Sequence, residues 1–149
     1  MIAELAGAVE ASGFGRWASG SALAYPIANV AHVLGLAGLL GAIGVYDLRM
    51  LGWGRALPAQ TLLAVVRPLA VGGFGLLVLS GAVLFAADAV ALAGSDLFRL
   101  KLILIVAAVA NAAAFEWIKP HGRAAAAFAA ASLILWITVA VAGRMIAYV

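Results

Sequence analysis

The sequence predicts an all-α protein, a bundle of four transmembrane helices with a short amphipathic helix before it and an interfacial helix in its first loop. Of the 149 residues, 67% are hydrophobic and 10% are charged, whereas about a quarter of a soluble domain is charged. Four apolar stretches approach or exceed the roughly 20 residues that a helix needs to cross a bilayer. The spans must be helical, because hydrocarbon leaves no backbone group unpaired and a few strands cannot close a barrel.

Residues 1–21 predict a helix lying on the membrane surface. The segment carries Glu4 where a signal peptide has basic residues, and glycines interrupt it. Leu5, Ala8 and Val9 recur at helical spacing, as in an amphipathic helix that inserts one face into a bilayer. A frayed tail is the alternative.

The first two spans flank the longest loop. We expect the first at about 22–46, which contains no formal charge, and the second at about 69–92. In the loop between them, Pro58 suits the first turn of a short helix, 59–66, lying along the interface.

The last two spans follow shorter connections. The third is expected at 98–118, with Ser95 as its N-cap. The fourth is expected at 124–148, after a tight polar turn that contains Pro120 and Gly122. We find no internal repeat, so the chain 1–149 is interpreted as one membrane domain.

Small residues predict close packing between the spans. Pairs four residues apart line the first span, and the second contains three neighbouring glycines: Ala31/Gly35, Ala37/Gly41, Gly38/Ala42, and Gly72, Gly73 and Gly75. Lipid tails give helices no hydrophobic reason to associate, so small residues must let their backbones approach.

The positions of Lys and Arg predict that both termini lie outside. The first and third loops and their flanks hold Arg49, Arg55, Arg67, Lys119 and Arg123. The other side holds Arg16, Arg99, Lys101 and Arg144, together with Glu4, Glu10 and Asp96. Basic residues concentrate on the cytoplasmic side.

His32 is the polar residue of the first span that most suggests chemistry. It lies about 15 Å into the span, with Asn29 one turn earlier on the same face. An ionisable group at that depth is costly unless it faces protein or a cofactor. Three interpretations stay open: a neutral histidine bonded to a carbonyl or hydroxyl of a neighbouring helix, an axial ligand of haem b, or part of a proton or polar pathway.

A haem held by His32 alone would leave one face open for a small molecule, and a haem with two axial ligands would need a second residue at the outer end. Met145 or a second copy of His32 across a dimer axis could provide a second ligand, whereas His121 lies at the far end of the bundle. Arg99, Lys101 and Arg144 could hold carboxylates, such as haem propionates or an anionic quinone. Alternatively, they form an interfacial belt of ion pairs and snorkelling side chains.

The polar residues of the inner end are interpreted as structural. Asp47 and Arg67 flank the long loop and could pair with each other, and Glu116 could pair with Lys119 at i+3. Asn111 is expected to hydrogen-bond another helix.

Short motifs spread along most of the chain resemble a family of small bacterial four-helix membrane proteins known only as a domain of unknown function. They are Tyr25–Pro26 before His32, Asp47–Leu48–Arg49, Leu51–Gly52, Arg67–Pro68, Gly73–Phe74, Leu84–Phe85–Ala86, Phe98–Arg99–Leu100–Lys101, Asn111–Ala112, Ala142–Gly143–Arg144 and Ile146–Ala147–Tyr148. The resemblance implies the four-helix fold and a bacterial cytoplasmic membrane, and brings no established activity. In that family a His often follows the Asn-Ala stretch; here Glu116 stands in the corresponding place, which weakens a two-histidine haem. A looser likeness to four-helix membrane cytochromes b covers architecture and an intramembrane His alone.

Three functions are therefore expected, in decreasing order. The first is a haem- or quinone-associated electron-transfer component that uses His32. The second is an accessory subunit or homo-oligomer within a larger membrane complex. The third is a transporter or channel, which the lack of inverted repeats disfavours. The absence of Cys excludes disulfides and thiolate metal sites, and no basic cluster suggests nucleic acid.

Overall fold

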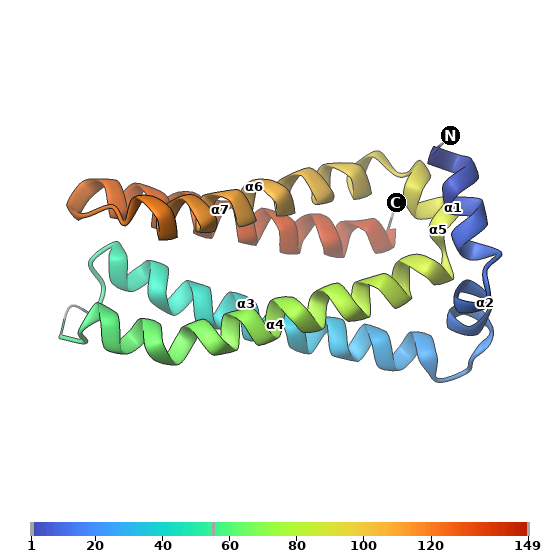
Figure 1. Ribbon diagram of the computed structural model, residues 1–149, viewed down its shortest axis with the longest axis horizontal. Coiled ribbons are helices and arrows are strands. Elements are labelled where there is room, and N and C mark those ends of the chain that lie inside the picture. The colour runs from blue at the N-terminus through green and yellow to red at the C-terminus, as the bar shows by residue number, and fades with distance from the viewer. Residues whose placement is uncertain (1, 55, 149) are drawn as a thin grey trace.

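The computed structural model describes residues 2–54 and 56–148, so Met1, Val149 and the loop cation Arg55 lie outside the described residues. Over the described part the chain is helical and has no strand (Figure 1). In chain order the helices are α1 (Ile2–Glu10), α2 (Gly13–Gly20), α3 (Ala24–Met50), α4 (Ala59–Ala87), α5 (Ala89–Gly94), α6 (Asp96–Ile118), α7 (Gly122–Met145) and the 3-10 turn η1 (Ile146–Tyr148).

Helices α3, α4, α6 and α7 are the membrane spans. The shortest, α6, has 23 residues, which gives about 34 Å at 1.5 Å per residue and exceeds a hydrocarbon core of about 30 Å. Their most apolar stretches have mean hydropathies of 1.8 to 2.2, yet only 6% to 28% of those residues are buried within the bundle. Apolar side chains this exposed need lipid around them, so the chain is a multi-pass integral membrane protein.

The spans form two hairpins. Helix α3 packs mainly on α4, and α6 packs mainly on α7. Contacts between α3 and α7 join the hairpins, whereas α4 and α6 barely meet (Figure 1). Leu39, Ala108, Trp136 and Val139 form the buried core at the junction.

The backbones of α3 and α4 approach most closely at two glycines. A Cβ atom added at Gly73 would lie 2.7 Å from the Leu39 backbone nitrogen, and one added at Gly35 would lie 2.9 Å from the Gly73 carbonyl oxygen. By contrast, Cβ atoms at Gly41 and Gly72 would meet nothing within 4 Å. Small residues therefore do let the spans approach, and Gly35 and Gly73 are the ones at the crossing.

Four element boundaries differ from the expectations. The first span continues to Met50, past its expected end at about 46, so Asp47 lies within α3. The N-terminal segment forms two helices, because the Ser12 hydroxyl accepts a hydrogen bond from Gly15 N at 3.0 Å and starts α2. Residues 59–66 are helical as expected, but they continue through Pro68 into the second span. A proline is tolerated in a membrane helix, although it removes one backbone hydrogen bond.

The second span also ends earlier than expected. Asp88 has an extended φ of −150° and separates α4 from the short helix α5. The boundaries of the last two spans follow the expected caps: the Ser95 hydroxyl accepts from Phe98 N at 3.3 Å, and Lys119 ends α6 in the left-handed conformation.

The two chain ends lie at one end of the bundle, called here the terminal end (Figure 1). Helix α1 packs on α5 there, and the Glu10 carboxylate accepts a hydrogen bond from Val90 N at 3.0 Å. The opposite end, where the α3–α4 and α6–α7 connections lie, is called the loop end.

Candidate functional site

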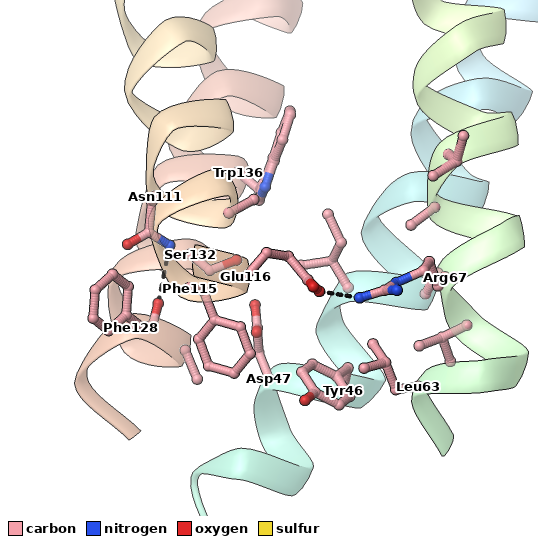
Figure 2. A pocket seen from close by; sticks show the side chains of 17 residues that line it. Tyr46, Asp47, Leu63, Arg67, Asn111, Phe115, Glu116, Phe128, Ser132 and Trp136 are labelled. Carbon is pink, nitrogen blue, oxygen red and sulfur yellow. Dashed lines mark hydrogen bonds and ion pairs between the residues drawn. The ribbon is translucent and has the colours of Figure 1, made fainter. Parts of the chain in front are cut away.

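A cavity of about 190 Å³ lies between the two hairpins at the loop end (Figure 2). Each of the four spans contributes to its wall. Nine of the 17 wall residues are polar or aromatic: Tyr46, Asp47, Arg67, Asn111, Phe115, Glu116, Phe128, Ser132 and Trp136.

Asp47 is the most unusual residue of the wall. It lies one turn before the end of α3, and only 6% of its surface is exposed. Its Oδ2 atom is buried and has no hydrogen-bond partner among the described residues. The Ser132 hydroxyl of α7 lies near the carboxylate and stabilises its charged form. A buried carboxylate oxygen without a partner is energetically costly, so such a group has room for a partner: a water molecule, an ion or a ligand.

Trp136 provides a second unsatisfied group on the same wall. It is 4% exposed, and its buried Nε1 has no hydrogen-bond partner among the described residues. Phe74 packs edge-to-face on its ring, with centroids 6.2 Å apart. Trp136 lies one turn beyond Ser132 on α7, about 6 Å along the helix axis, and it lines the same cavity as Asp47.

An ion pair crosses from one hairpin to the other at this cavity. Arg67 of α4 pairs with Glu116 of α6, and about half of each side chain is exposed (Figure 2). The expected pairs Asp47–Arg67 and Glu116–Lys119 were wrong. Asp47 faces α7 instead of α4, and Lys119 lies beyond the regular turns of α6, so it does not occupy the i+3 position of a helix.

Aromatic rings form another part of the wall. Phe115 contacts Tyr46 and Phe128 edge-to-face, with ring centroids 6.2 and 6.0 Å apart. Asn111 lies behind them and donates to the Phe128 carbonyl at 3.1 Å. The prediction that Asn111 bonds another helix is confirmed.

His32 lies far from the cavity, because it precedes Asp47 by fifteen residues on α3, about 22 Å. Its Nδ1 is 3.0 Å from the Ser80 hydroxyl, which itself donates to the Leu76 carbonyl at 2.6 Å. Nδ1–H is therefore the donor in the first bond, and Nε2 carries the lone pair. Gly81 lies beside the ring, where a Cβ would make an ordinary contact 3.4 Å from Cε1.

The other residues expected at the outer end do not assemble around His32. Lys101 comes nearest, close enough to act on His32 electrostatically, and its Nζ would lie 3.2 Å from a Cβ at Gly143. Arg99 instead binds Asp96 at 3.0 Å and the Ala93 carbonyl. Arg144 lies 4.9 Å from the Tyr148 ring centroid.

Met145 and Asn29 are both exposed. The described residues thus build no two-ligand haem site within one chain, and among them no three His, Asp or Glu residues could hold a metal ion. The tautomer of His32 leaves Nε2 as the ring atom able to ligate, an arrangement found in metal-binding histidines. Haem ligation by His32 stays a prediction of the sequence.

Sequence reasoning missed that Asp47 and Trp136 line the same cavity. From the sequence, Asp47 was expected to pair with Arg67, and Trp136 was not singled out as a site residue. One available signal was the i, i+4 spacing of Ser132 and Trp136, which puts two hydrogen-bonding side chains on one face of the fourth span.

Comparisons of the chain with protein-family models, with curated proteins and with solved structures found no match.

Proposed function

We propose that this protein binds a lipid-soluble molecule of the quinol class, with the ring held in the cavity between the hairpins. One observation carries the proposal: Asp47 and Trp136 line the same cavity, and each has a buried polar atom, Oδ2 and Nε1, that is unpartnered among the described residues. The proposal concerns binding, and it keeps the quinone class expected from the sequence while moving the site from His32 to the loop end.

The volume of the cavity fits a ligand head that consists of a single six-membered ring. A cavity of about 150 Å³ is large enough to take up benzene. The 190 Å³ available here therefore suits one six-membered ring with a few small substituents, and is far too small for a haem. The aromatic wall of Tyr46, Phe115 and Phe128 offers edges and faces for such a ring.

The two unpartnered groups match a ligand with one oxygen substituent that donates a hydrogen bond and another that accepts one. An ionised carboxylate only accepts hydrogen bonds, and an indole N–H only donates them. A quinol has hydroxyls at opposite ends of its ring, so one can donate to Asp47 while the other accepts from Trp136. A quinone carbonyl can accept from Trp136 but cannot donate to Asp47, so we expect the reduced form to bind more tightly.

Replacement of Asp47 by leucine tests the proposal. Removal of an unpaired buried charge in favour of a similar apolar side chain is neutral or stabilising. If Asp47 is there for a ligand, Asp47→Leu should keep or raise the thermal unfolding temperature in detergent while it weakens binding of duroquinol at least tenfold. Binding is measured by anaerobic calorimetry, with duroquinone as the oxidised comparison.

Controls for both groups are available in the chain. Asp88 is exposed at the terminal end, and Trp117 is 91% exposed. Asp88→Leu and Trp117→Phe should leave binding unchanged, whereas Trp136→Phe should weaken it by roughly fivefold to tenfold, the loss of one hydrogen bond of about 1 kcal/mol. No binding by the unaltered protein, or a loss of stability with unchanged binding in Asp47→Leu, would contradict the proposal.

A further inference from the structure

The cavity is closed on one side and open on the other. The wall residues on α3 and α7 are buried or half-buried, and Asp47, Ser132 and Trp136 lie at this closed floor. All of the exposed wall residues belong to α4 and α6: Arg67, Val71, Ala112 and Glu116. The mouth therefore opens sideways between α4 and α6, the two spans that barely pack on each other.

The rim of this mouth is polar toward the loop end and apolar toward the middle of the bilayer. Arg67 and Glu116 form its polar edge toward the loop end. Val71 and Ala112 lie one turn farther toward the middle of the bilayer on the same two helices, and Val71 is 67% exposed. A molecule in the cavity thus meets a charged edge on the water side and an apolar gap on the hydrocarbon side.

We propose that the ligand carries an apolar tail, which leaves the cavity through the α4–α6 mouth across Val71 and Ala112 into the bilayer. This inference rests on the proposed function and adds the tail and the direction of access. A bound head with its oxygen groups on Asp47 and Trp136 has hydrocarbon directly outside the apolar rim, so an isoprenoid or alkyl tail stays solvated by lipid. The ligand then reaches the site sideways from the membrane, without crossing water.

Bulky side chains at the apolar rim test the inference. Val71→Phe and Ala112→Phe should weaken binding of the tailed decylubiquinol at least tenfold and change binding of the tail-less duroquinol less than twofold, because only the tail passes the rim. Val65 is 61% exposed on the same helix and does not line the cavity. Val65→Phe is therefore the matched control and should affect neither ligand.

A tailed quinol with a photoreactive group on its first tail carbons gives a second measurement. Crosslinks should appear on peptides of α4 and α6 around Val71 and Ala112, and excess decylubiquinol should suppress them. Crosslinks on α3 and α7, equal losses for both ligands in the rim variants, or no loss for either would each overturn the tail assignment while the ring site stands. Failure of both ligands to bind the unaltered protein would remove the proposed function, and this inference with it.

Discussion

His32 and Asp47 are both polar residues of α3, and they differ in the hydrogen-bond partners of their side chains. His32 donates to the Ser80 hydroxyl of the neighbouring helix, so its ring is tied to the hairpin of which it is a part. Asp47 has the Ser132 hydroxyl on one side and an oxygen without a partner on the other. The bond of the first residue accounts for it by helix association, whereas the second has no such partner among the described residues for its Oδ2 atom, and we propose a ligand there.

Replacement of His32 by alanine should therefore reduce stability. The variant loses one hydrogen bond between α3 and α4 and leaves Ser80 without this donor, a cost of about 1 kcal/mol. We expect a lower thermal unfolding temperature in detergent and unchanged duroquinol binding. His121 is exposed in the α6–α7 turn, and His121→Ala is the control. An unfolding temperature equal to that of the unaltered protein would show that the bond to Ser80 contributes nothing.

Residue identity alone could not have predicted which polar groups meet. The sequence showed that Asp47, Arg67 and Glu116 lie near one end of the bundle, but a helix can present each side chain in any direction around its axis. In the structure the rotation of α3 turns Asp47 toward Ser132, and Arg67 then meets Glu116. Asn111 was predictable because a mid-span amide has to bond to another helix wherever it points.

At the scale of elements, the α3–α4 hairpin depends on the closeness of its two backbones. Span positions could be predicted from hydropathy, and the N-cap at Ser95 from its position before the third span. The continuity of α4 through Pro68 could not be predicted, because local preference favours a boundary at that residue whereas packing against α3 favours a continuous helix. The glycine stripe predicted close packing, yet it did not tell which glycines lie at the crossing.

Alanine substitutions at two neighbouring glycines distinguish the effect of helix packing on stability from the effect of helix propensity. Gly73→Ala places a methyl group 2.7 Å from the Leu39 backbone, so the helices must move apart, at a cost of about 1–3 kcal/mol. Gly72→Ala meets nothing within 4 Å and should be neutral or stabilising by up to about 1 kcal/mol. Unfolding of both variants in the same detergent measures the difference. Equal stabilities would show that α3 and α4 are not in contact at this crossing.

At the scale of the whole molecule, the even number of spans puts both chain ends on one side of the membrane (Figure 1). The excess of Lys and Arg at the loop end predicts that this end faces the cytoplasm and that the terminal end lies outside.

Cysteine labelling can test this orientation because the native chain contains no Cys. Asp96 lies at the terminal end with 96% of its side chain exposed, and Gln60 is exposed at the loop end. In intact cells, a membrane-impermeant thiol reagent should label Asp96→Cys at once and Gln60→Cys only after permeabilisation. The reverse pattern would show that the Lys and Arg distribution does not set the orientation.

The division into two hairpins has a consequence for how the protein is made. The first hairpin holds its own tightest contacts, at Gly35 and Gly73, so it can pair in the bilayer while the second is still being synthesised. The floor of the cavity, however, combines Asp47 from the first half with Ser132 and Trp136 from the last helix. The cavity therefore comes into existence only when α7 reaches α3, and no partly synthesised chain can hold a ligand in it.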